Sequence, residues 1–150
     1  MAFGAASEMF VATIEYQYEG GSFNLGTDSM KIALYSDTPT PDEEVALANT
    51  VYGVDQWITG SEEYDAAEWP QTGQVLGSPT STVAAGVWTF DAADEVSDGT
   101  SATLDTYGCL IYDDAVSDYG ICFLSFNGSN SVVDGTLTVQ FGAGICTITV

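Results

Sequence analysis

The most extended pattern of apolar positions lies between residues 105 and 126. Two short runs, residues 107–112 and 120–126, are rich in Ile, Tyr, Phe, Leu and Cys, and the polar segment 113–119 separates them. Short apolar runs bounded by turn residues predict the two strands of a β-hairpin. Because the runs are nearly continuous rather than alternating, we expect this hairpin at the centre of a sheet that is covered on both faces.

A helical pattern precedes the strands. Apolar side chains near the N-terminus recur at spacings of three and four residues; they are Phe3, Ala6, Phe10, Ile14 and Tyr18. This spacing predicts an amphipathic helix over residues 3–18, which the glycines at positions 20 and 21 end.

The rest of the chain predicts further short strands. They are expected at residues 30–35, 74–76, 83–90, 136–141 and 145–150, with a short helix at 43–51 and a turn at 127–130. Many short strands after one helix favour a mostly β protein, an antiparallel, jelly-roll-like β-sandwich. We expect one domain over residues 1–150, with residues 1–20 as a helical extension.

The net charge limits the partners that this protein can bind. The chain has 22 acidic residues against one Lys, with no Arg and no His, for a net charge of −21. Such a surface repels the phosphates of nucleic acids and of anionic membranes, so neither is expected as a partner. It suits high salt or a basic partner. No signal peptide or membrane-spanning run is evident, so we expect a protein made in the cytoplasm.

Catalysis is not expected. Without His there is no imidazole base for a Ser or Cys nucleophile, and without Arg there is no guanidinium for phosphoryl transfer. Phosphate-binding glycine motifs are also missing from the sequence. A pair of carboxylates in a cleft stays formally open as glycosidase chemistry. We predict a non-enzymatic protein without a cofactor.

The acids and cysteines favour structural roles. Acidic residues gather in two turns; they are Asp91, Asp94, Glu95 and Asp98 in the first, and Asp113, Asp114 and Asp118 in the second. Oxygen ligands in loops suit calcium, but neither turn has the residue order of a calcium loop, so we predict solvated turns and no metal site. The three cysteines, Cys109, Cys122 and Cys146, lie in predicted strands, where we expect small buried side chains.

Aromatic residues are the candidates for a binding surface. Trp57, Tyr64 and Trp69 lie in an irregular acidic segment, where partial exposure is expected. Together with the helix residues Phe3, Phe10, Ile14 and Tyr18, they form the predicted interface. Anchoring of a long loop onto the core is the stronger interpretation of the tryptophans. A sugar-stacking platform that includes Trp88 is the alternative.

The order of elements resembles that of a known group of proteins. It comprises the D-x-x-KIALY strand from Asp28 to Tyr35, the WTFDAADEV segment from Trp88 to Val96 and the YGCLIYDD and GICFLSF hairpin. The strands TLTVQF and ICTITV follow. This pattern resembles small virion structural proteins of tailed bacteriophages, described as head-decoration, minor capsid or cement proteins.

The resemblance implies a mostly β protein on the exterior of the capsid. Its partner would be the major capsid protein, and the protein would be a homo-oligomer, with a trimer favoured. A tail or head-tail adaptor protein is the runner-up, and a tail-tube protein would show a long hairpin that joins neighbouring rings. A carbohydrate-binding module for a host receptor is a third possibility.

Overall fold

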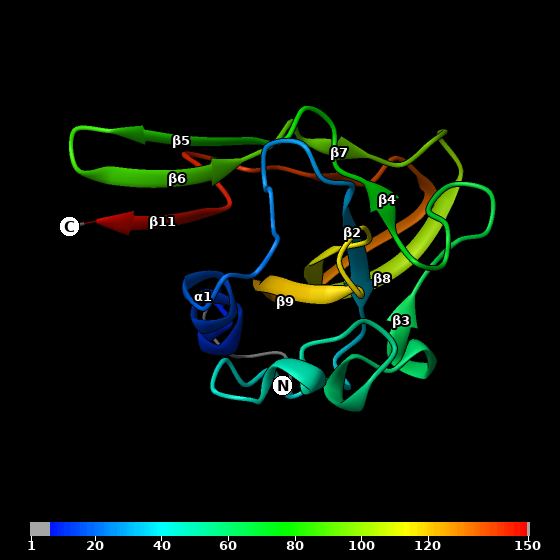
Figure 1. Ribbon diagram of the computed structural model, residues 1–150. Coiled ribbons are helices and arrows are strands. Elements are labelled where there is room, and N and C mark those ends of the chain that lie inside the picture. The colour runs from blue at the N-terminus through cyan, green and yellow to red at the C-terminus, as the bar shows by residue number, and fades with distance from the viewer. Residues whose placement is uncertain (1–6, 150) are drawn as a thin grey trace.

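The computed structural model describes residues 7–149 and confirms a mostly β chain with antiparallel strands and one N-terminal helix. The strands are β1 (Glu8–Met9), β2 (Met30–Tyr35), β3 (Glu62–Glu63), β4 (Gln74–Val75), β5 (Thr80–Ala84), β6 (Val87–Asp91), β7 (Glu95–Val96), β8 (Ala102–Asp113), β9 (Tyr119–Gly135), β10 (Thr138–Val139) and β11 (Cys146–Thr149). The helices are α1 (Val11–Tyr18) and three 3₁₀ turns, Leu47–Asn49, Asp55–Trp57 and Thr59–Ser61. Figure 1 shows their arrangement.

The predicted hairpin is the centre of the largest sheet. Strands β8 and β9 pair with each other, and the sheet runs in the order β1-β9-β8-β2-β3, with β4 also paired to β2. Leu34 of β2 lies opposite Cys109 of β8, which lies opposite Leu124 of β9. The prediction that this hairpin occupies a central position is therefore confirmed.

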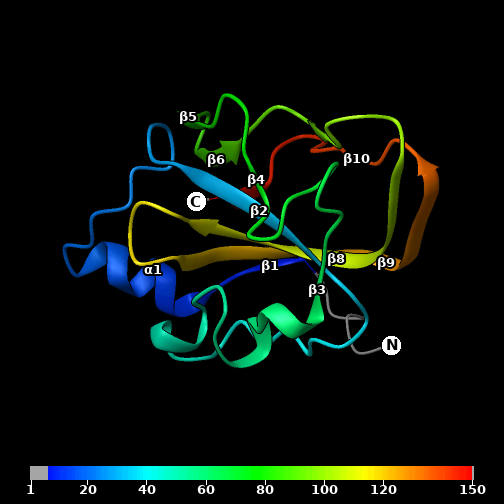
Figure 2. The ribbon, with the colours of Figure 1, turned by 90° about the vertical axis from the view of Figure 1, so that its right-hand side faces the viewer.

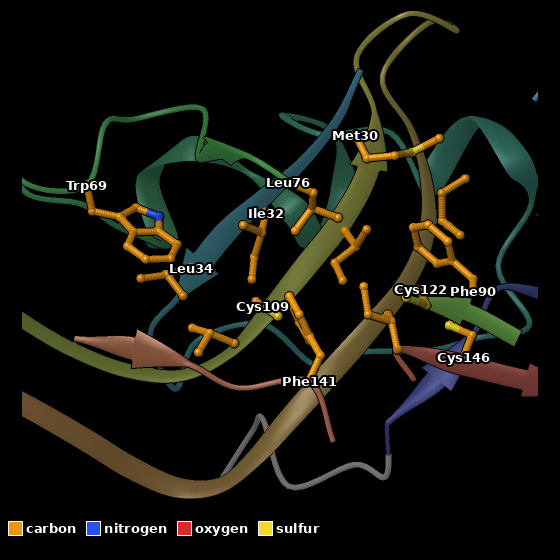
Figure 3. Close-up of a cluster of buried hydrophobic side chains, with 14 of the residues drawn as sticks. Met30, Ile32, Leu34, Trp69, Leu76, Phe90, Cys109, Cys122, Phe141 and Cys146 are labelled. Carbon is orange, nitrogen blue, oxygen red and sulfur yellow. The ribbon is translucent and has the colours of Figure 1, made fainter. Parts of the chain in front are cut away.

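Both faces of this sheet are buried, as the nearly continuous apolar runs predicted. Along β2, Ile32 and Leu34 point into one apolar cluster, whereas Ala33 and Tyr35 point into another on the opposite face. Side chains alternate between faces in a strand, so one strand serves both clusters. Figure 3 shows the first cluster.

Different parts of the chain cover the two faces. Strands β5, β6 and β11 form a second sheet, and β7 pairs with β10. Phe90 of β6, Val139 of β10 and Cys146 of β11 close the first cluster. The loop segment 42–61 lies on the other side of the sheet, as Figure 2 shows, and its Trp57 fills the second cluster.

The predicted N-terminal helix is wrong at its beginning. Residues Glu8 and Met9 form a strand that pairs with β9, and the helix starts only at Val11. The chain ends this helix as predicted, because Gly20 adopts a positive φ of 98° and the N–H of Gly21 donates to the carbonyl of Tyr16 at 2.9 Å. Residues 8–18 are thus part of the folded body.

Several other boundaries also differ from the predictions. The expected helix at 43–51 is only a 3₁₀ turn at Leu47–Asn49. The expected strand at 83–90 is a hairpin, β5–β6, and the strand at 136–141 shortens to β10. At 127–130 the chain does not reverse.

The turn expected at 127–130 is a bulge inside β9. Thr106 lies opposite Asn130 and Gly108 opposite Ser125, so four residues of β9 face one residue of β8. Asn127 and Gly128 have positive φ values of 59° and 137° there. The turn-forming residues therefore bend a continuing strand instead of ending it.

Candidate interaction surface

An apolar groove lies between α1 and the sheet β5–β6–β11. Its volume is about 420 Å³, and its apolar walls include Met9, Ile14, Phe23, Leu25, Trp88 and Ile148. The Trp88 indole N–H donates to the Ser81 hydroxyl at 2.9 Å, which holds this ring across the groove. Grooves of this size with mostly apolar walls are suited to binding an apolar partner group.

The sheet beside the groove projects from the body. Figure 1 shows β5, β6 and β11 extending beyond the central sheet on the side of α1. We call these three strands the arm. All five residues of β5 are exposed, and β5 is an edge strand that pairs only with β6. Val83 is 75% exposed and lies near the end of the arm.

The groove and nearly all of the arm are uncharged parts of an acidic protein. Residues 69–90 and 135–150 contain no charged residue, although the chain has 22 acids, and they include the whole arm except Asp91 at the end of β6. Of the described residues that line the groove, none is charged. Depletion of charge is typical of the buried centre of protein interfaces. The arm and groove are therefore the strongest candidate contact surface in residues 7–149.

The predicted interface residues do not lie together on one surface. Ile14 and Tyr18 line the groove, and Tyr18 is 88% exposed. Tyr64 is 48% exposed but lies outside the groove. Phe10 is fully buried. Phe3 lies outside the described residues.

The expectation that Trp57 and Trp69 are partly exposed is wrong. Both side chains are fully buried, so neither contacts a partner in this conformation. Trp57 packs edge-on against Tyr35 at 5.2 Å between ring centroids, and its carbonyl accepts a 2.8 Å bond from the Tyr35 hydroxyl. These tryptophans anchor loops to the core, which was the stronger interpretation, and the predicted sugar-stacking platform loses two of its three tryptophans.

The structure also contains a cluster of polar side chains that the sequence did not reveal. Tyr52 stacks on Tyr112 with 4.9 Å between ring centroids, and its hydroxyl donates to Glu62 at 2.7 Å. The backbone N–H of Thr72 donates to the same carboxylate at 2.8 Å. Burial raises the pKa values of Tyr52, Tyr112 and Glu62. The residues come from distant segments, so no local motif reveals the cluster.

This Tyr–Glu cluster is best explained as a structural clamp. It joins the loop that holds Tyr52 to the strand β3 and to the loop at Thr72. The hydroxyl of Tyr112 donates to the carbonyl of Thr72 at 2.6 Å, which closes the network from the side of the central sheet. Every polar group described here is engaged with another part of the chain, which is typical of structural networks.

The acidic turns bind their own backbone. Asp94 accepts a 2.8 Å bond from the N–H of Phe141, and Asp113 accepts bonds from Ala115 and Val116. Asp114 forms a 3.0 Å ion pair with Lys31, the only cation in the sequence. Within residues 7–149, no group of three or more His, Cys, Asp or Glu is arranged to hold a metal ion.

The cysteines are small buried side chains, as predicted. Cys109, Cys122 and Cys146 are all free thiols in the first apolar cluster. Figure 3 shows Cys122 and Cys146 in this cluster, near Phe90. Burial raises the pKa of the Cys109 thiol, which keeps it protonated and unreactive.

Between residues 7 and 149, no helix is both long and apolar enough to cross a membrane. A search of protein-family models, curated proteins and solved structures finds no match to this chain.

Proposed function

We propose that this protein is a non-enzymatic virion structural protein that decorates the capsid of a tailed phage. Its partner is the outer surface of the major capsid protein shell. The observation that carries this proposal is the division of the molecule into an acidic body and an arm that is uncharged except for Asp91, with an adjacent uncharged groove. A protein that coats a shell needs such contact surfaces and no catalytic groups.

The two parts of the surface support two kinds of contact. The acidic body suits basic patches on a capsid shell, since opposite potentials favour docking. The nearly uncharged arm suits contacts between copies of the protein that cover the same shell. Many weak contacts repeated over a symmetric shell add up to firm attachment.

Co-sedimentation with undecorated phage shells tests this proposal. We expect saturable binding at a fixed ratio to the major capsid protein, and weaker binding as salt rises from 0.05 to 1 M, because salt screens attraction between opposite charges. Albumin, another acidic protein, serves as a control for trapping in the pellet. Absence of binding at every salt concentration would overturn the proposal.

A tail protein is the second candidate, and one observation favours it. The hairpin β5–β6 projects from the body, whereas the sequence indicated only one hairpin, and that one was buried. Projecting hairpins can join neighbouring subunits of a ring. Electron microscopy of the purified protein distinguishes the two candidates, because rings or tubes formed without shells would favour the tail protein.

A further inference from the structure

The end of the arm has an unusual composition for a β-turn. Strands β5 and β6 are joined by Ala85 and Gly86, which have positive φ values of 50° and 79°. Two-residue turns of this geometry usually hold Asn-Gly or Asp-Gly, because these residues tolerate positive φ and bond to water. Here the whole end, residues 83–87, reads VAAGV and contains only apolar side chains and Gly. We call these five residues the tip.

The tip is exposed to solvent rather than packed on its own chain. Residues 83–86 are all exposed. Contact of the apolar tip with water is unfavourable, and covering the tip with another apolar surface would lower the free energy. The strained Ala85 is a further cost in the isolated chain.

The groove is complementary to the tip in chemistry. Both are apolar, and both are uncharged in a chain with a net charge of −21. The groove lies beside the arm, with Ile14 and Tyr18 of α1 on one wall and Trp88, which is opposite Val83 in the hairpin, on the other. Tyr18 is 88% exposed, so the outer part of this wall is accessible.

Charge decides which occupant we infer. Two copies of a strongly acidic protein repel each other wherever their acids meet, so they can associate only through surfaces without charge. The tip and the groove are such surfaces, and they adjoin in one molecule, because Val83 of the tip lies opposite Trp88 of the groove wall. A basic partner would instead bind to the acidic body, because the uncharged groove offers it no electrostatic attraction.

We propose that the tip of one copy inserts into the groove of a second copy, so that this protein self-associates through its arm. The contact is heterologous, since two different surfaces meet, and it closes either as a reciprocal pair or as a ring. The role of this contact between copies on a shell rests on the proposed function. The contact itself forms without the shell.

Sedimentation velocity of the purified protein over a concentration series tests the contact. The tip variant is Val83→Glu and the groove variant is Tyr18→Glu, both at exposed positions where the fold tolerates substitution. The matched control is Val133→Glu on β9, because Val133 is 77% exposed, close to the 75% of Val83, but lies outside the arm and the groove. Circular dichroism of each variant verifies the fold.

The expected results are specific to a tip-in-groove contact. Wild type and Val133→Glu sediment as oligomers, and Val83→Glu and Tyr18→Glu each sediment as monomers. Self-association of the wild type strengthens with salt, since screening weakens repulsion between like-charged copies.

Other results would overturn the inference. A wild type that stays monomeric at all concentrations and salt levels has no such contact. Oligomers of Val83→Glu or of Tyr18→Glu would place any contact elsewhere. Shell binding separates the two proposals: a monomer that still binds shells contradicts only the self-association, whereas an oligomer that never binds shells contradicts only the capsid function.

Discussion

At the scale of single residues, burial separates side chains that look equivalent in the sequence. Phe10, Ile14 and Tyr18 have helical spacing, yet Phe10 is fully buried and Tyr18 is 88% exposed. Phe10 packs against Phe123 at 5.5 Å and Trp57 at 6.0 Å between ring centroids. It therefore belongs to the core of the second cluster, and Tyr18 belongs to the surface.

Replacing Phe10 tests this assignment. We expect Phe10→Ala to lower the free energy of unfolding by about 3–5 kcal/mol, because it leaves a cavity beside the rings of Phe123 and Trp57. Urea denaturation measures the loss. Tyr64→Ala is the control, since Tyr64 is about half exposed and the change should cost far less. Equal losses for the two variants would contradict the assignment.

A buried carboxylate makes stability depend on pH. Burial raises the pKa of Asp113 from 3.8 to about 6, and the nearby Asp28 carboxylate adds to this, whereas the N–H groups of Ala115 and Val116 lower it. The folded state thus binds a proton more tightly than the unfolded state. Stability from this group falls as pH rises from about 4 to 6, and the loss persists above pH 6.

The variant Asp113→Asn removes the loss of stability that ionisation of Asp113 causes. Its amide oxygen can still accept from Ala115 and Val116, so we expect unfolding free energy to rise by about 1–3 kcal/mol at pH 8. At pH 4.5 the gain should nearly vanish, since Asp113 is then protonated in the folded wild type. Urea denaturation at both pH values measures it. The exposed Asp98, changed to Asn, should show no comparable difference.

At the scale of elements, the arm combines regular pairing with a costly turn. Strand β6 lies between β5 and β11, with Thr89 opposite both Thr82 and Thr147. Three paired strands hold the hairpin extended from the body. Its turn, however, places Ala85 in a left-handed conformation that suits Asn or Gly better.

A substitution in this turn measures the cost. We expect Ala85→Asn to raise the unfolding free energy by about 1 kcal/mol, because Asn tolerates the left-handed conformation. Ala84→Asn is the matched control, since Ala84 lies in strand β5, where Asn is unfavourable. Denaturation at concentrations that keep the protein monomeric measures both. An unchanged or lower value for Ala85→Asn would contradict a strained turn.

At the scale of the whole molecule, charge is unevenly distributed. Of the 22 acids, only Asp134 lies beyond residue 118, so the C-terminal strands are nearly neutral. The remaining 21 acids face one Lys, and the single ion pair described joins Lys31 to Asp114. Repulsion within this acidic body opposes folding, and little within the chain offsets it.

Salt should therefore stabilise the protein. We expect the urea midpoint to rise between 0.05 and 1 M NaCl, because screening reduces repulsion among the acids of the folded body. The same ionic strength in KCl should give the same rise if screening is the cause. A midpoint that falls with salt would show that attractive pairs, rather than repulsion, dominate the charge energy.

Local patterns of the sequence determined the class and the centre of the fold. The strand Met30–Tyr35 and the hairpin at residues 105–126 were predictable, because two-sided burial demands continuous apolar runs. Gly20 and Gly21 marked the end of α1, since a helix commonly stops with glycine in the left-handed conformation. The jelly-roll-like sandwich stays a prediction.

Only the tertiary structure decided which apolar residues are inside and where the contact surface lies. Trp57 is buried because the loop around it folds onto Tyr35, a contact across 22 positions of sequence. The groove exists because α1 and the arm, distant in the chain, lie beside each other. Burial depends on which segments meet, and spacing along the chain reports only the periodicity of one segment.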